Sequence, residues 1–244
     1  MAERICVIGD IHGELNTLKN LHNKLINQYP DVDIYSTGDL IDRGPDSKGV
    51  IQFCINNNIK VIRGNHDDML IRMLKGELGT YRMHTNDGMG GHNTVKSYGL
   101  DPWLADTIYK YKDAIPTSHK SFLYDLPYYR LVQVGFGNHK YFINHAGLSR
   151  YDWLETFQEH SNELNDIEDL INVAVNEHYD NLLWEHKKSN FADLTEYGVV
   201  QVIGHYPIRE PQIEDECIMI DLGCGKKGRL GAIILPDKKV IIAD

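Results

Sequence analysis

Short apolar runs and amphipathic stretches alternate over the first third of the chain. The run Ile5-Cys6-Val7-Ile8 has the length and composition of a fully buried strand. Leucines at near-helical spacing then indicate an amphipathic helix, and these are Leu15, Leu18, Leu21 and Leu25. The same pattern predicts strands over 33–37 and 60–63 and helices over 47–57 and 69–74. Such an alternation predicts parallel strands joined by right-handed crossovers.

The remainder of the chain is less regular. Between residues 76 and 126 glycines cluster, and helices are predicted over 103–112 and 118–126. The segment Gly135-Phe136-Gly137-Asn138 indicates a hairpin between strands at 128–134 and 140–144. A polar, partly helical stretch over 150–196 precedes the last predicted strands, at 199–203, 218–221, 231–235 and 240–242. We expect one α/β (α+β) domain over 1–244, with a helical insertion at about 76–126.

Each early strand ends in a polar cluster flanked by glycine. The three clusters are Gly9-Asp10-Ile11-His12-Gly13, Gly38-Asp39-Leu40-Ile41-Asp42-Arg43-Gly44 and Gly64-Asn65-His66-Asp67. In an open α/β sheet, ligands bind beyond the carboxyl ends of the strands. The sequence therefore predicts that these polar side chains meet at one edge of the sheet.

The residue types in these clusters are those that bind metal ions. Asp10 and His12 are two positions apart, so in extended chain their side chains point the same way. Later strands end in Asn144-His145-Ala146-Gly147 and in Gly204-His205. The candidate ligands are Asp10, His12, Asp39, Asn65, His145 and His205. This set exceeds what one tetrahedral ion needs and suits two ions that share a bridging carboxylate.

Charge and cysteine content narrow the range of partners. The 244 residues include 35 acidic and 25 basic side chains, a formal charge of −10. This balance opposes nonspecific binding to nucleic acid or to an anionic membrane. No window approaches the ~18 apolar residues of a membrane span, and the four cysteines form no CxxC pair. We expect a cytoplasmic protein with neither a nucleic-acid nor a membrane partner.

Five motifs in fixed order resemble those of a known family. They are GDIHG (9–13), GDLIDRG (38–44), GNHD (64–67), HAG (145–147) and GH (204–205). In this order they resemble the calcineurin-like metallophosphoesterases. The chain is most similar to the bacterial and phage branch of the phosphoprotein phosphatases, which includes symmetrical diadenosine tetraphosphate hydrolases. The resemblance implies a β-sandwich flanked by helices and a dinuclear centre of Mn²⁺, with Fe²⁺ and Zn²⁺ as alternatives.

The resemblance also implies a role for each motif residue. Asp10 and His12 would bind the first metal together with Asp39, which bridges to a second metal held by Asn65, His145 and His205. A metal-bridging hydroxide would attack phosphorus, and His66 would protonate the leaving oxygen as general acid. Asp42 would pair with His66, and Arg43 would bind the phosphate oxygens together with Asn65. Arg63 could assist, although a structural salt bridge explains it equally well.

One segment departs from the family pattern. Members of this branch carry Trp-x-Arg before the last histidine motif, and that arginine is a second phosphate ligand. Here the segment reads Leu183-Trp184-Glu185-His186-Lys187. His186 therefore occupies the position of the arginine, and we expect it to contact substrate, although neither it nor Lys187 reproduces a bidentate guanidinium.

Other patterns have simpler explanations. Gly223-Cys224-Gly225-Lys226-Lys227-Gly228 spells G-x-G-x-x-G, but a strand rather than a helix is predicted next, so we interpret it as a turn. The other histidines show no paired spacing and suit surface or core positions: His22, His84, His92, His119, His139, His160 and His178. Of these, His92 has the best claim to approach the site, because it follows Gly90-Gly91 in a glycine-rich loop.

These residues predict a metal-dependent phosphoesterase. Its expected substrates are phosphate monoesters on a phosphoprotein, as in a serine/threonine phosphatase, or on a phosphorylated small molecule. Hydrolysis of dinucleoside tetraphosphates by the same machinery is the alternative. A non-catalytic scaffold on this fold is disfavoured, because the six candidate ligands and His66 are all present.

Overall fold

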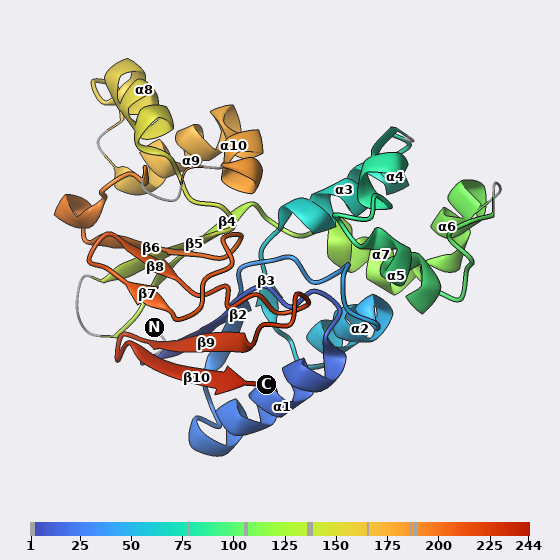
Figure 1. The fold of residues 1–244 in the computed structure, drawn as a ribbon. Helices are drawn as coiled ribbons and strands as arrows, with labels where there is room; N and C mark the ends of the chain where they lie inside the picture. The colour runs from blue at the N-terminus through green and yellow to red at the C-terminus, as the bar shows by residue number, and fades with distance from the viewer. Residues whose placement is uncertain are drawn as a thin grey trace.

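The computed structural model describes residues 3–77, 79–104, 107–135, 139–164, 166–185, 187 and 190–244. Its strands form two five-stranded sheets, with the orders β10-β9-β1-β2-β3 and β4-β5-β6-β8-β7. The two sheets lie one above the other, with helices on their outer sides (Figure 1). An apolar layer that includes Val7, Ile143, Val202 and Ile233 fills the space between them. The predicted sandwich flanked by helices is confirmed.

The first sheet carries the early strand–helix alternation. Strands β1 (Ile5–Ile8), β2 (Asp33–Ser36) and β3 (Lys60–Val61) are parallel, while β9 (Leu230–Leu235) and β10 (Lys239–Ala243) extend the sheet in antiparallel fashion. Helices α1 (Leu15–Gln28) and α2 (Ser47–Asn56) cover its outer face. Alternate β1 residues pack toward these helices and toward the second sheet, which explains why the strand is apolar throughout.

The second sheet is mixed. Strands β5 (Lys140–Asn144), β6 (Val199–Ile203) and β8 (Cys217–Met219) are parallel, and the edge strands β4 (Tyr129–Gln133) and β7 (Gln212–Ile213) run antiparallel to their neighbours. Its outer side is covered by α8 (Arg150–His160), α9 (Ile167–Glu177) and α10 (Tyr179–Trp184), followed by a short 3₁₀ helix at Thr195–Tyr197. The β4–β5 pair agrees with the predicted hairpin, although residues 136–138 lie outside the described residues.

A group of helices extends from the first sheet. It consists of α3 (Asn65–Leu74), α4 (Gly79–His84), α5 (Gly91–Ser97), α6 (Thr107–Ala114) and α7 (Thr117–Tyr124). Their apolar residues, among them Val95, Tyr111 and Leu123, join the same core cluster as α1 and α2. The helical character predicted for 76–126 is correct, but α4 and α5 were not predicted, and α3 begins four residues before the expected Met69.

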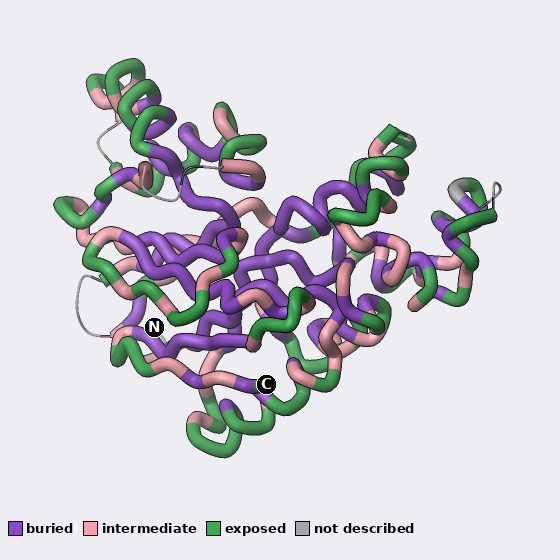
Figure 2. Tube along the Cα trace, in the orientation of Figure 1, coloured by how far each residue is buried: buried purple, intermediate pink, exposed green. Residues whose placement is uncertain are grey.

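Buried backbone continues past the ends of the strands into the centre of the molecule (Figure 2). The motif segments lie there, and most of their polar side chains are buried: Asp10, His12, Asp39, Asp42, Asn65, His66 and His145. No helix in the described part of the chain has the length and apolar character needed to cross a lipid bilayer.

Candidate metal centre

The candidate ligands lie on loops that leave the carboxyl ends of β1, β2, β5 and β6, and on the first turn of α3. Several of these residues adopt left-handed backbone conformations, with φ of +48° at His12, +49° at Asp39 and +64° at His205. Such conformations are costly for residues other than glycine and concentrate at functional sites. Glycine is required at neighbouring positions for a steric reason, because a Cβ at Gly64 or Gly204 would collide with a carboxylate of the cluster.

Asp39 stands at the centre of the cluster. Its Oδ2 lies 3.6 Å from His12 Nε2 and 4.0 Å from His66 Nε2, and its Oδ1 lies 3.6 Å from His145 Nε2. The carboxylate also accepts a hydrogen bond of 2.9 Å from the backbone N–H of His66. Burial would raise the pKa of Asp39, but the three imidazoles outweigh it and hold the pKa below its ordinary value.

The remaining candidate ligands surround this carboxylate. His145 Nε2 lies 2.9 Å from Asn65 Oδ1 and 3.2 Å from His205 Nδ1. Asp10 accepts hydrogen bonds from the His205 backbone N–H at 3.0 Å and from Thr37 Oγ1 at 3.0 Å. Two groups of potential ligand atoms result, one of Asp10, Asp39 and His145 and the other of His12, Asp39 and His66. Asp39 belongs to both groups, and Asn65 and His205 lie beside His145. The second group also contains His66, which the motifs predicted as the general acid and not as a ligand.

The donor set suits divalent cations. His12 Nδ1 donates to Ile41 O at 2.9 Å and His145 Nδ1 donates to Thr37 O at 2.8 Å, so each Nε2 is left to face the cluster as a ligand. Burial lowers the pKa of both imidazoles, which favours the neutral form that binds metal. Burial, with the nearby Asp221 and Asp39 carboxylates, raises the pKa of Asp10 well above its ordinary value. A bound cation would relieve this repulsion.

His66 faces the cluster from the first turn of α3. Its Nδ1 donates a 2.6 Å hydrogen bond to Asp42 Oδ2, and its Nε2 lies 3.1 Å from Arg43 Nη2. Burial acts against the charged imidazolium, but Asp39 and Asp42 prevail and raise the pKa of His66 above its ordinary value. Arg43 also contacts His12 Nε2. The structure therefore places a histidine–carboxylate pair and a guanidinium beside the predicted ligands.

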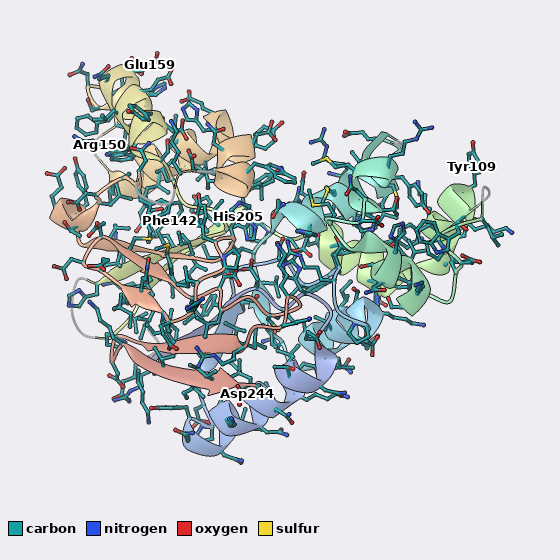
Figure 3. The ribbon with its side chains drawn as sticks, viewed as in Figure 1. Tyr109, Phe142, Arg150, Glu159, His205 and Asp244 are labelled. Carbon is teal, nitrogen blue, oxygen red and sulfur yellow. The ribbon has the colours of Figure 1, made fainter. Side chains whose placement is uncertain are left out.

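These side chains open onto a cavity of about 390 Å³. Its polar wall is formed by Asp39, Arg43, Asn65, His66, His205 and Lys226, and its remaining wall by Met83, Asn86, Gly88, Met89 and Trp184. His205 lies near the middle of the molecule, between the helices of the second sheet and the α3–α7 group (Figure 3). The cavity thus combines a polar wall of candidate ligands with a wall that includes the apolar side chains of Met83, Met89 and Trp184.

Three further predicted positions lie apart from the cluster or outside the described residues. Arg63 is structural, since its guanidinium pairs with Asp68 at 3.3 Å and donates to Leu126 O at 3.0 Å. The ring of His92 packs against Trp103 with centroids 4.2 Å apart. His186 lies outside the described residues.

Sequence reasoning missed several residues of the site. Thr94 Oγ1 donates to Asp42 Oδ1 at 2.6 Å, and His84 Nδ1 lies 3.3 Å from Asp42 Oδ2. Both belong to the 76–126 segment, where no motif marked them. The G-x-G-x-x-G segment is a turn, as expected, and it contributes Lys226 to the wall of the cavity. The sequence feature that could have indicated Lys226 is the pair of lysines between glycines in the loop before β9.

The arrangement is that of a metal-dependent hydrolase of phosphate esters. The model of the calcineurin-like phosphoesterase family matches residues 3–228, and the chain belongs to this family. The chain is 28% identical to serine/threonine-protein phosphatase 2 of Escherichia coli over 93% of its own length and 90% of that protein. It is 27% identical to an asymmetrical bis(5'-nucleosyl)-tetraphosphatase of Anoxybacillus flavithermus over 96% of its own length and 91% of that protein.

Other matches are partial or structural. The symmetrical bis(5'-nucleosyl)-tetraphosphatase of Buchnera aphidicola is 43% identical over 68 residues, 27% of this chain and 24% of that protein. A crystal structure assigned as a diadenosine tetraphosphatase has a TM-score of 0.61 at 20% identity, and covers 100% of this chain and 94% of its own. A protein serine/threonine phosphatase from Saccharomyces cerevisiae has a TM-score of 0.52 at 17% identity, with 98% and 78% coverage. These two likenesses show the fold.

Proposed function

We propose that this protein is a phosphomonoesterase with two bound divalent cations, and that it acts on phosphoserine and phosphothreonine in proteins. The observation that carries the proposal is the position of Asp39, with three imidazole nitrogens within 4.0 Å of its two oxygens and the Asp42–His66 pair alongside. A carboxylate in this position can bridge two cations, which otherwise repel each other.

The proposed ligand roles follow the motifs. Asp10, His12 and Asp39 would hold one ion, and Asp39, Asn65, His145 and His205 would hold the other. A pair of cations at such a site supplies Lewis-acid activation of the phosphate and of a water nucleophile. Mixed carboxylate and imidazole donors suit Mn²⁺, with Fe²⁺ and Zn²⁺ as the other candidates.

The chain's own residues would perform the remaining steps. Arg43 would bind phosphate oxygens, and its buried Nε, which has no hydrogen-bond partner in the described part of the chain, supports this role. His66 would donate the proton of Nε2 to the leaving oxygen, while Asp42 fixes the ring through Nδ1. The raised pKa of His66 supports the charged form that this step requires.

The comparisons support two classes of substrate. The full-length similarity to a bacterial serine/threonine-protein phosphatase favours phosphoproteins. The comparable similarity to an asymmetrical bis(5'-nucleosyl)-tetraphosphatase makes dinucleoside tetraphosphates the second candidate. Turnover of a phosphoserine peptide and of diadenosine tetraphosphate by one Mn²⁺-loaded preparation separates the two substrates.

The variant His66→Asn tests the reaction itself. We expect turnover of the phosphoserine peptide to fall by about 10²–10⁴-fold, because the variant loses its proton donor and this is the usual contribution of a general acid. None of the six proposed metal ligands is changed. Metal content measured by mass spectrometry should stay at two ions per chain. A wild-type protein that hydrolyses no phosphate ester with Mn²⁺, Fe²⁺ or Zn²⁺ contradicts the proposed function, whereas undiminished turnover by the variant removes only the role of His66.

A further inference from the structure

The loop at 223–228, between β8 and β9, packs directly against the metal cluster. A Cβ at Gly225 would lie 2.6 Å from that of His12 and 3.2 Å from that of Arg43, and the residue has φ of +77°. Only glycine permits this approach at this backbone angle. The loop is also fixed internally, since Gly223 O accepts from the N–H of Lys226 at 2.9 Å and of Gly228 at 3.0 Å. The position of Lys226 at the rim of the cavity is therefore built into the fold.

Lys226 and Arg43 face the same cavity. Burial and the charge of Arg43 lower the pKa of Lys226, against the opposing effect of Asp221, Asp39 and Asp10. No ion pair of Lys226 is present among the described residues. Lys226 and Arg43 are like charges in one cavity, and an anion bound between them would reduce their mutual repulsion.

A second cavity, of about 560 Å³, is also lined by Lys226. Four cationic side chains line it, namely Arg209, Lys226, Lys227 and Arg229, against one carboxylate, Glu210. Glu210 pairs with Arg229 at 2.8 Å, which leaves a net positive charge around this cavity. We call it the basic cavity. The chain as a whole carries a formal charge of −10, so this local positive charge is opposite in sign to the net charge of the protein.

We propose that Lys226 binds the reacting phosphate together with Arg43, and that the basic cavity binds a second phosphate group of the same substrate. The inference deepens the proposed function and rests on it. Lys226 lines both cavities and therefore connects the two proposed phosphate positions. A polyphosphate chain and a peptide with neighbouring phosphorylated residues both present this chemistry.

Binding of phosphonates to the Mn²⁺-loaded protein tests the proposal without turnover. Isothermal titration calorimetry would compare methylphosphonate, which has one phosphonate group, with methylenebisphosphonate, which has two. We expect the wild-type protein to bind the bisphosphonate more tightly. Lys226→Ala should weaken bisphosphonate binding by about tenfold or more, the effect of losing one charge-assisted hydrogen bond. Arg209→Ala should weaken the bisphosphonate alone, because Arg209 lines only the basic cavity.

Lys239→Ala is the matched control. Lys239 lies on β10, where its Nζ bonds Gln28 and stacks over Tyr29, and its loss should change neither affinity. The proposal is overturned if Lys226→Ala binds each of the two phosphonates as tightly as the wild-type protein does. Equal weakening of both phosphonates by Lys226→Ala, with no effect of Arg209→Ala, would overturn the part that concerns the second phosphate.

Turnover identifies the source of the second phosphate. The kcat/KM of wild-type and Lys226→Ala protein would be measured on diadenosine tetraphosphate, a doubly phosphorylated peptide and its singly phosphorylated counterpart. The substrate that supplies the second phosphate is the one whose kcat/KM falls about tenfold more in Lys226→Ala than the kcat/KM of the singly phosphorylated peptide does. An equal loss of kcat/KM on all three substrates contradicts the second subsite. Hydrolysis of p-nitrophenyl phosphate reports phosphoester cleavage without a second phosphate. A wild-type protein inactive on it and on all three substrates removes the proposed function, whereas an active wild-type protein with an unaffected Lys226→Ala variant removes this inference alone.

Discussion

At the residue scale, the most informative group is the carboxylate of Asp42, which two histidines share. His66 donates to its Oδ2 at 2.6 Å, His84 Nδ1 approaches the same oxygen to 3.3 Å, and Thr94 donates to Oδ1 at 2.6 Å. Burial would raise the pKa of Asp42, but His84 and His66 hold it below its ordinary value. The carboxylate that orients the proposed general acid is therefore itself held by two residues of the helical segment.

Loss of His84 should impair proton donation by His66 more than any other step. We expect His84→Phe to slow hydrolysis of a phosphoserine peptide by about tenfold or more, since general acids contribute 10²–10⁴-fold. Hydrolysis of p-nitrophenyl phosphate should change much less, because its phenolate leaves without full protonation. His84→Asn keeps a donor toward Asp42 and should recover part of the loss. Steady-state kcat on the two substrates gives the comparison, and equal losses on both would mean that His84 only supports the fold.

The limits of sequence prediction are clear at this scale. Asp42 and His66 belong to glycine-flanked motifs at strand ends, so local spacing revealed them. Asp42 and Thr94 are 52 residues apart, and His84 and Thr94 have no local pattern that distinguishes them from core residues. Their contact with Asp42 depends on how α4 and α5 pack against the loop after β2, a tertiary arrangement that hydrophobic periodicity does not encode.

At the element scale, the start of α3 shows how the site shapes a helix. Periodicity predicted a helix from Met69, because Gly64-Asn65-His66-Asp67 has low helix propensity. The helix begins instead at Asn65, with Asp67 Oδ2 accepting the N–H of Gly64 at 3.1 Å. The other oxygen of Asp67 accepts the N–H of Leu40, also at 3.1 Å. Asp67 therefore joins the loop that carries Asp39 to the helical turn that carries Asn65 and His66.

Removal of this connection should destabilise the whole site. Asp67→Ala leaves two buried backbone donors without acceptors, so we expect a loss of about 2–4 kcal/mol in the free energy of unfolding. Asp67→Asn keeps one acceptor oxygen and should lose about half as much. Urea denaturation of the metal-free proteins measures both. A value for Asp67→Ala within error of the wild-type protein would show that water satisfies these donors.

At the scale of the whole molecule, the first sheet and its crossovers were predictable because parallel strands buried on both faces have a distinctive apolar pattern. The convergence of five motifs on one region also follows, since loops at the carboxyl ends of strands share an edge. What could not be predicted is the relative position of the second sheet and of the α3–α7 group. Those contacts place Met83, Met89 and Trp184 in the cavity wall, where they would surround a bound substrate.

Assembly of the site from distant segments implies that bound metal stabilises the entire fold, and that this effect depends on pH. Burial and neighbouring carboxylates raise the pKa of Asp10, and burial raises that of Asp221 to about 6, so the metal-free fold holds protons that the unfolded chain releases. These two groups stabilise the metal-free fold below the unfolded carboxyl pKa of about 4, and that contribution is lost as pH rises through their folded values.

A bound cation favours the ionised form of Asp10 and of Asp221, whose pKa values are raised in the metal-free fold, so the increase in Tm on adding Mn²⁺ should grow as pH rises through about 6. Burial lowers the pKa of His12 and His145, which favours the neutral imidazole and opposes proton release from these two ligands on binding. Scanning calorimetry with and without Mn²⁺ measures the difference. Asp39→Asn removes the shared carboxylate and should abolish the shift at every pH, whereas a shift that stays constant with pH would show that Asp10 is ionised before metal binds.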